Sequence, residues 1–317
     1  MANETTTTTL TEIVNSEWIR PAFQDYAADW LVATQFLLRF DLRGRGTATV
    51  AVPSIISDMG TVSDGGAGVD TEYDATEATD LTNTTMDLSE ATISTSEYGV
   101  MRTITDTALE DTVDGFNMIQ EIVNDSARIL ATALEDDVCA LFAGFGTTVG
   151  TSGSPLTLTN MSDGVTTIRA AGVRAPDGIV FVLDDEQASE YEAALISTNA
   201  AAAVYAGAAD RLLSANPTPN NGLANGHIGF FRQYPVYMTG LTDTANMGAD
   251  VVGAAFVRGD TAGNARMAAL GLAVSREFTV ATERNESLRA TEVVATQRMG
   301  VGELLDAAGV KLVTDAP

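Results

Sequence analysis

The sequence has a single cysteine, Cys139, and a single histidine, His227, among its 317 residues. One cysteine excludes an intrachain disulfide and fits a reducing compartment such as the cytoplasm. A Ser/His/Asp or Cys/His nucleophile system would have to use His227, which lies in an Asn-Gly-His context far along the chain from Cys139. We interpret His227 as a surface or structural residue, and a hydrolase that uses it remains a second hypothesis.

The sequence also lacks the patterns that hold cofactors. No Cys/His spacing is typical of a metal site, and no dinucleotide-binding fingerprint follows a predicted strand. The glycine-rich segment 144–153 follows a predicted helix and has no Gly-Lys-Ser/Thr end, so it predicts a flexible turn and not a phosphate loop. Neighbouring carboxylates such as those at 135–137 are expected by chance in an acidic chain. We predict no catalytic residue, no metal and no cofactor.

Basic residues are scarce, with 17 Lys and Arg against 43 Asp and Glu and a net charge of −26; Lys311 is the only lysine. This composition disfavours direct wrapping of nucleic acid, because phosphate contacts need clustered basic side chains. The acidity is consistent with saline surroundings or with a surface that avoids anionic polymers. No apolar run approaches the ~18 residues of a membrane span, and no secretory signal pattern begins the chain, so no membrane partner is predicted.

One long amphipathic segment organises the chain. Between residues 112 and 145 apolar side chains recur at spacings of three, four and seven, which predicts a helix over about 115–143. At ~1.5 Å per residue, this helix would be roughly 40 Å long. Asp111 or Asp114 is expected to cap its start, and Gly144 and Gly146 to end it.

The segment before this helix is rich in aromatic residues. Residues 10–40 have a mixed helical pattern and contain both tryptophans of the chain. Two interpretations stay open: a helix packed on its own core, or an arm whose aromatic side chains dock on another subunit. A small cluster of Arg39, Arg43 and Arg45 follows, which is typical of a solvated face or of ion pairs between subunits.

Residues 46–105 have no helical period. Alternation at 48–52 predicts a strand, and a second alternating set runs from Met86 through Tyr98 to Ile104. An acidic, glycine-rich stretch lies between them and lacks the ligand spacing of a calcium loop, which favours a solvated tip. A lone two-stranded excursion of this length is marginally stable in water, so we expect it to lie on a neighbour.

The rest of the chain mixes helices and strands without regular alternation, which favours the α+β class. Helices are predicted at 162–174, with Ser162 as the cap, and at 184–195. The continuous apolar run 178–183 is typical of a buried strand. Further strands are expected around Pro235, at 251–257, 268–274, 290–295 and 310–313. Residues 214–226 form a loop, and residues 276–298 contain a polar stretch before the strand at 290–295.

This order of parts resembles the major capsid proteins of tailed phages with the Hong Kong 97 fold. The resemblance is clearest over 104–145, where ITDTALEDT precedes the long helix and ALEDDVCALFAGFG ends it; Thr105 and Thr107 depart from the commonest entry pattern. The segment GHIGFFRQYPVYMTG at 226–240 is similar to the glycine–apolar–Pro–Val segment of the family.

The resemblance implies an α+β fold with five parts along the chain. These are an N-terminal arm (1–43), an extended β-hairpin loop (44–101), a peripheral domain with the spine helix (102–161), an axial domain (162–279) and peripheral return strands (280–317). The arm and loop would wrap neighbouring subunits. The residues expected at these interfaces are Trp18, Phe23, Trp30, Arg39, Arg43, Arg45 and Tyr98.

The implied function is that of a non-enzymatic major capsid protein. Copies would assemble as hexamers and pentamers, in the host cytoplasm, into the icosahedral shell of a virion that encloses double-stranded DNA without sequence-specific binding. A portal at one vertex and a scaffolding protein are implied partners, with a decoration or cement protein as an optional one. An encapsulin-like compartment shell is the alternative within the fold, and the missing signal disfavours a surface-layer or adhesin protein.

Two further expectations concern assembly. Because the aromatic arm begins near residue 10, we expect no cleaved scaffolding segment and a separate scaffolding protein. The type member of the family joins its subunits through a lysine in the extended loop, but 44–101 contains no lysine. Arginine cannot replace it because its guanidinium stays protonated, so we expect a shell held by noncovalent contacts.

Overall fold

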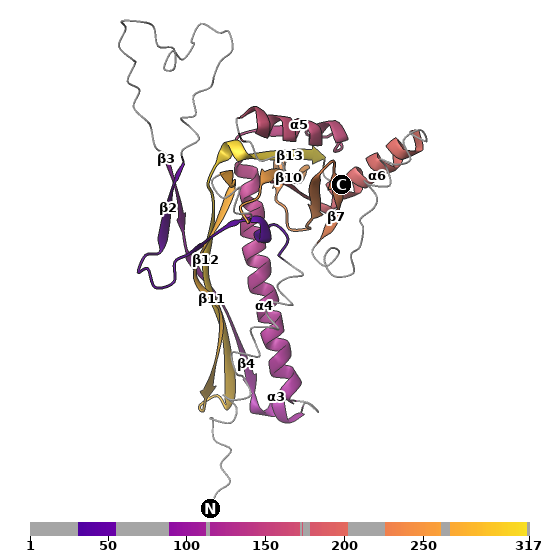
Figure 1. Ribbon diagram of the computed structural model, residues 1–317. Coiled ribbons are helices and arrows are strands. Elements are labelled where there is room, and N and C mark those ends of the chain that lie inside the picture. The colour runs from indigo at the N-terminus through magenta and orange to yellow at the C-terminus, as the bar shows by residue number, and fades with distance from the viewer. Residues whose placement is uncertain are drawn as a thin grey trace, which may run out of the picture.

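The structure is a computed structural model that describes residues 31–54, 89–111, 115–171, 173, 178–201, 226–260 and 267–315. It has the predicted α+β class, with a long helix beside one sheet and a second sheet at the end of that helix (Figure 1). None of the helices in these ranges is long and apolar enough to cross a membrane. The predictions for 10–30, for the loop tip and for 202–225 lie outside the described residues.

The predicted long helix is confirmed. Helix α4 spans Gly115–Ala140 and continues as the 3-10 turn η4 (Leu141–Gly144), so the chain leaves helical structure at the predicted glycine. Its apolar face packs along most of its length, first against one sheet and then into the main core. A shorter helix, α3 (Asp106–Asp111), precedes it and was not predicted.

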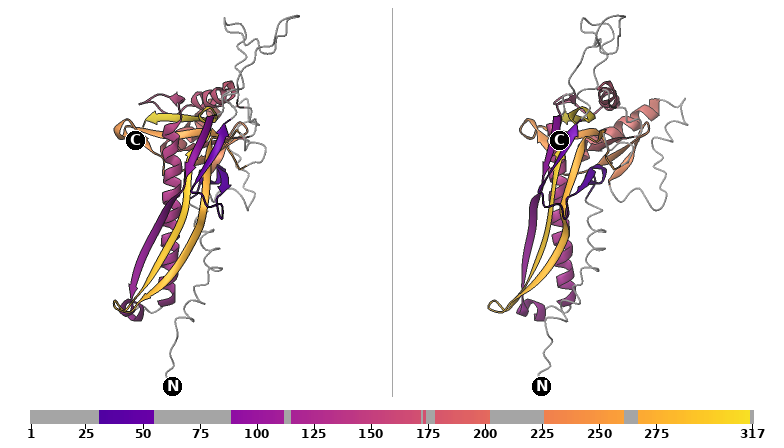
Figure 2. Two further views of the ribbon diagram at one scale, coloured as in Figure 1. Left: turned by 90° about the vertical axis from the view of Figure 1, so that its left-hand side faces the viewer. Right: turned by 60° about the vertical axis from the view of Figure 1, so that its left-hand side comes forward.

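A four-stranded sheet runs along α4. Its order is β1 (Leu38–Asp41), β11 (Leu270–Asn285), β12 (Ala290–Glu303) and β4 (Ser96–Thr105), with β1 parallel to β11 and the other pairs antiparallel. Figure 2 shows β11 and β12 as one long hairpin that follows the helix to its far end. The helix-facing side buries Phe278, Val293 and Ala295 against Val123 and Leu130.

The structure adds to one prediction in this region and corrects another. Residues 276–285, described above only as a polar stretch, form the outer half of β11, in which Phe278 is buried and Glu277 and Thr279 are not. Residues 36–40, expected to be helical, form the end of the 3-10 turn η1 (Thr34–Phe36) and strand β1. Pairing with β11, more than two hundred residues away, decides this local structure.

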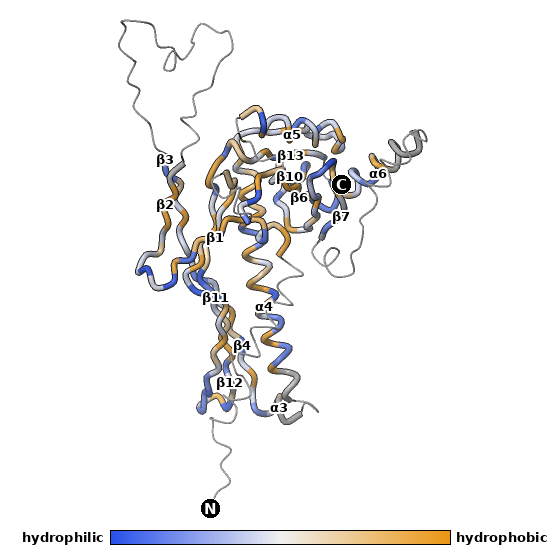
Figure 3. Tube along the Cα trace, in the orientation of Figure 1, coloured by the Kyte–Doolittle hydropathy of each residue, from blue (hydrophilic) through white to orange (hydrophobic). Residues whose placement is uncertain are grey.

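The second sheet has seven strands. Six follow the order β5 (Thr148–Gly150), β13 (Gly309–Asp315), β10 (Asp250–Val257), β6 (Ile179–Leu183), β8 (Tyr234–Met238) and β7 (His227–Phe231), and β9 (Thr244–Ala245) pairs with β10. Every residue of β6 and β10 is buried, as their apolar runs predict. Figure 3 shows this hydrophobic concentration, in contrast to the hydrophilic tip of the β11–β12 hairpin.

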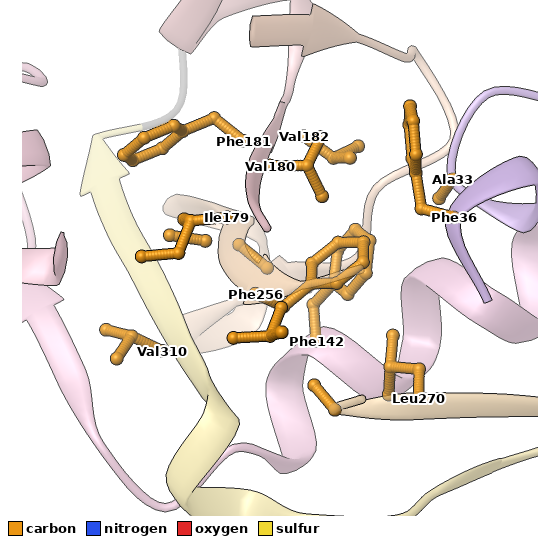
Figure 4. Packing of buried hydrophobic residues seen from close by; sticks show 14 of the residues in the cluster. Ala33, Phe36, Phe142, Ile179, Val180, Phe181, Val182, Phe256, Leu270 and Val310 are labelled. Carbon is orange, nitrogen blue, oxygen red and sulfur yellow. The ribbon is translucent and has the colours of Figure 1, made fainter. Parts of the chain in front are cut away.

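Helices and the end of α4 cover the two faces of this sheet. On one face, Gly164 of α5 (Leu158–Ala170) lies near Ala255, and Gln187 of α6 (Asp185–Ala201) lies against Gly253. On the other face, the ring of Phe142 from η4 packs against Phe256 with 5.7 Å between centroids. Figure 4 shows these two rings overlapping within the core cluster, with side chains of η1 at its edge.

Two predicted details near α5 differ from the structure. The helix begins at Leu158 with Thr157 as its cap, whose hydroxyl accepts a hydrogen bond from the Asn160 amide at 3.2 Å. Ser162, the predicted cap, lies inside the helix and accepts a hydrogen bond from Arg232. The glycine-rich segment, predicted as a flexible turn, includes β5, which pairs with β13.

The remaining strands, β2 (Thr49–Ser54) and β3 (Ser89–Ser94), form the base of the hairpin between β1 and β4. This base lies on the four-stranded sheet, where Ile93 and Leu42 form a small cluster with Ala273. The main chain of Ser94 approaches Gly300 so closely that a Cβ there would lie 2.0 Å from its carbonyl oxygen. Residues 96–105, predicted to extend this excursion, instead belong to the sheet beside α4.

Candidate assembly surfaces

Residues 32–37, which we call the arm root, connect the upstream aromatic segment to the folded body. The carboxylate of Glu135 on α4 accepts hydrogen bonds from three consecutive backbone amides: those of Val32 at 3.1 Å, Ala33 at 2.5 Å and Thr34 at 3.1 Å. The Thr34 hydroxyl donates a fourth bond at 2.7 Å. These amides lie at the start of the turn η1, and the first amides of a helical turn have no acceptor within the turn. The Glu135 side chain, from a distant helix, therefore caps η1.

Glu135 is completely buried. Burial raises the pKa of its carboxyl group, and the hydrogen bonds from Ala33 and Thr34 oppose that rise. Sequence reasoning missed this residue and treated 135–137 as carboxylates present by chance. The available signal was its position on the apolar face of α4, one residue after Leu134 and three before Val138, both of which are buried.

The other side of the arm root contacts the seven-stranded sheet. The ring of Phe36 lies 4.7 Å from that of Tyr237, and the Arg258 guanidinium lies 5.3 Å from the Phe36 ring. The amide of Gly259 donates to the Phe36 carbonyl at 2.7 Å. The arm root is therefore held between the helix and the second sheet before the chain enters β1.

The predicted arginine cluster lies where the hairpin begins. Arg39 forms an ion pair with Glu277 of β11 at 2.7 Å, and Arg43 pairs with Asp41 through two hydrogen bonds from Nε at 2.9 and 3.0 Å. The Arg43 guanidinium holds the pKa of the Asp41 carboxyl well below its usual range. Arg45 is exposed and forms no ion pair within the part of the chain that the structure describes. Exposed pairs of this kind contribute little to stability, which leaves the cluster available for contacts.

Tyr98 lies on the helix-facing side of β4 and is half-buried. Its hydroxyl donates a hydrogen bond to the Asp137 carboxylate on α4. Burial and this carboxylate raise the pKa of Tyr98 to about 12. The side chain therefore connects the sheet to the helix within one chain. The predicted interface residues Trp18, Phe23 and Trp30 lie outside the described residues.

The two candidate residues of a hydrolase lie in apolar surroundings. His227 packs between the rings of Phe230 and Tyr237, at centroid distances of 4.9 and 5.0 Å, and burial lowers its pKa. Cys139 is fully buried in the main core, and burial raises the pKa of its thiol, which disfavours the reactive thiolate. No group of three or more His, Cys, Asp or Glu side chains able to hold a metal occurs among the described residues.

Comparison with solved structures finds this architecture in proteins of several solved capsids and particles. The chain is similar to the capsid protein of the cyanophage P-SCSP1u, with a TM-score of 0.61 and 11% identity over 90% of this chain and 89% of that one. It is also similar to the capsid of the Helicobacter pylori bacteriophage KHP30 (TM-score 0.59, 13% identity, covering 88% and 87%). A virus-like particle from Pyrococcus furiosus is a further match (TM-score 0.54, 12% identity, covering 93% and 98%).

No protein-family model matches the sequence, and no curated protein matches it either. The relationship is therefore visible in the fold and not in sequence identity. The chain has the Hong Kong 97-like capsid fold, as the order of its sequence segments predicted, and the similarity extends over nearly the whole length of the chain.

Proposed function

We propose that this chain is the major capsid protein of a tailed phage, a component of the virion. Copies assemble as hexamers and pentamers into the icosahedral shell that encloses the double-stranded DNA genome. The observation that supports this most strongly is the likeness to phage capsids over about nine tenths of both chains, since it involves the entire architecture and not one shared motif. The protein has no catalytic activity in this proposal.

The proposed contacts follow the partition expected from the sequence. The arm (1–43) upstream of the arm root and the hairpin loop (44–101) before β4 reach neighbouring subunits, while 102–161 and 280–317 form the peripheral domain and 162–279 the axial domain. Trp18, Phe23 and Trp30 supply the aromatic contacts of the arm. Arg39, Arg43 and Arg45 supply charge at the base of the loop, and Tyr98 positions β4 against the chain's own helix.

The proposed partners are, first, other copies of the chain. A scaffolding protein directs assembly, a portal occupies one vertex, and a decoration or cement protein is an optional addition. Packaged DNA is enclosed and not bound by sequence, because a surface with a net charge of −26 offers few phosphate contacts. An acidic inner surface would keep the DNA from adhering to the wall.

An encapsulin-like compartment is the second candidate, favoured by the likeness to the virus-like particle from Pyrococcus furiosus. Such a shell has the same fold and differs in what it encloses. The contents of purified native particles separate the two: nuclease-protected double-stranded DNA identifies a phage capsid, and a protein cargo without DNA identifies a compartment.

Electron microscopy of the expressed protein, alone and with a co-expressed scaffold, tests the proposal. We expect rings or closed shells of uniform diameter, and a mass distribution dominated by pentamers, hexamers and complete particles. A variant that lacks residues 1–30 is the matched control, because it removes the part of the arm before the arm root and keeps every residue of the described body. A wild-type chain that remains monomeric under all these conditions would overturn the proposal.

A further inference from the structure

The buried contact between Glu135 and the arm root has no role in catalysis or cofactor binding, and the core does not require a charge at this position. Val32, Ala33, Phe36 and Leu37 are themselves buried and would hold the arm root by apolar contacts alone. Apolar burial is non-directional, whereas hydrogen bonds are restricted in angle as well as distance. The carboxylate therefore supplies a constraint on orientation that the apolar side chains do not.

The geometry of the contact sets the direction in which the chain leaves the body. Three successive amides, those of Val32, Ala33 and Thr34, converge on the two oxygens of one carboxylate, which restricts the backbone dihedrals of three neighbouring residues together. The chain upstream contains both tryptophans of the protein. A change of backbone direction at the arm root therefore changes where the chain before it is directed.

We propose that Glu135 is the residue that positions the arm for assembly: its carboxylate fixes the exit direction of residues 1–31 so that they meet a second copy of this chain. This inference rests on the proposed function, because it assigns a role in subunit contact. It concerns a residue that touches no neighbour itself and acts through the arm root. Removing it should impair assembly while the isolated body stays folded.

The chain offers a closely matched set of variants. In Glu135→Gln one carboxylate oxygen becomes a carboxamide NH2 group, which donates hydrogen bonds and cannot accept them. In either orientation at least one backbone amide loses its acceptor, because Val32 and Ala33 donate to one oxygen and Thr34 to the other. Asp136→Asn removes the same charge from the next residue of α4, where the side chain is exposed. Thr34→Val removes only the hydroxyl donor, and Thr34→Ser keeps it.

The tryptophans provide a readout that is specific to the arm. Both lie upstream of the arm root, at 18 and 30, so tryptophan fluorescence reports on the arm and on no other part of the chain. Quenching of the tryptophan fluorescence by acrylamide is measured before and after assembly is triggered. Particle yield is measured by sedimentation. Far-ultraviolet circular dichroism during heating monitors the folded body in the same samples.

We expect wild type, Asp136→Asn and Thr34→Ser to assemble with the same yield and to protect their tryptophans on assembly. Glu135→Gln should assemble at least about tenfold less, because the loss of even one hydrogen bond of about 1.4 kcal/mol corresponds to a factor of ten. Its tryptophans should stay accessible, while the thermal transition of the body is retained. Thr34→Val should show the same change to a smaller degree.

Other outcomes are informative in different ways. If Glu135→Gln folds, assembles and protects its tryptophans like wild type, the positioning role is overturned. If Glu135→Gln does not fold, Thr34→Val against Thr34→Ser decides: equal assembly and equal quenching in that pair overturn the role. If wild type itself never assembles, the proposed function fails; a Glu135-dependent change in tryptophan quenching in the free subunit would then still show that the residue controls the arm.

Discussion

The side chain of Gln297 on β12 donates a hydrogen bond from Nε2 to the backbone carbonyl of Leu130 on α4, at 3.0 Å, and both residues are buried. This carbonyl lies in the middle of the long helix, where it is also placed to accept the usual hydrogen bond within the helix. The contact therefore adds a polar connection between sheet and helix at the level where β11 has two register shifts opposite β12.

We predict that Gln297→Met, which preserves size and removes the donor, lowers the free energy of unfolding by about 1 kcal/mol. The cost stays small because the Leu130 carbonyl keeps its partner within the helix. Urea unfolding followed by circular dichroism measures the change. Gln120→Met is the control, since that part-buried amide bonds to the Asn124 side chain on the same helix. Equal effects of the two substitutions would contradict a specific contribution from the sheet–helix contact.

A second prediction concerns Tyr98 at high pH. Burial and the Asp137 carboxylate raise the pKa of Tyr98 to about 12, above the ordinary value of 10. The protonated hydroxyl therefore contributes stability that is fully present below about pH 10 and is lost as the pH rises through about 12. Ultraviolet absorbance of the phenolate, taken as the difference between wild type and Tyr98→Phe, should give one phenol with a midpoint near pH 12. A midpoint near pH 10 would show that the Tyr98 hydroxyl is exposed to solvent and not bonded to Asp137.

A third prediction tests how the hairpin base is seated. A Cβ at Gly300 would lie 2.0 Å from the Ser94 carbonyl oxygen, so Gly300→Ala must push β3 away from the sheet. We expect a loss of about 1–3 kcal/mol in stability and a reduced yield of assembled particles. Gly164→Ala is the matched control: its Cβ would lie 3.8 Å from Ala255 in an ordinary contact, and the helix gains up to about 1 kcal/mol. Wild-type assembly by Gly300→Ala would show that the hairpin base does not need this seat.

A fourth prediction concerns the bonds between subunits. The only lysine, Lys311, lies on β13, where its Nζ donates to the Ala143 carbonyl at 3.3 Å, and 44–101 contains none. Mature particles boiled in detergent should therefore give a single band near the chain mass of 33.1 kDa on a denaturing gel. A ladder of higher bands would reveal covalent joining of subunits by another route.

Much of the framework could be predicted from the sequence. The amphipathic period of α4 and the apolar runs of β6 and β10 are local patterns, because a helix face repeats every three to four residues and a fully buried strand is apolar throughout. Those three elements lie within a few residues of their predicted bounds. The order of segments was enough to indicate the fold, although sequence identity with the three solved structures named above is only 11–13%.

Elements with one solvent-facing side were harder to predict. The outer half of β11 has many polar side chains, so its sequence does not by itself indicate a strand. Its pairing with β12 makes it one. Strand β1 has only four residues and depends on a parallel partner that lies far along the chain. The segment 96–105 alternates like a hairpin strand, but pairing with β12 places it in the sheet beside α4.

The sequence by itself determined the α+β class, the long helix, the absence of an intrachain disulfide and the absence of a lysine in the loop, since each depends on composition or on local periodicity. Only the tertiary structure decided which groups the Glu135 carboxylate binds. Its place on the apolar face of α4 is a local feature, but its hydrogen-bond donors lie more than one hundred residues earlier in the chain. A buried charge is stable only where such partners converge, and that convergence exists only after the chain has folded.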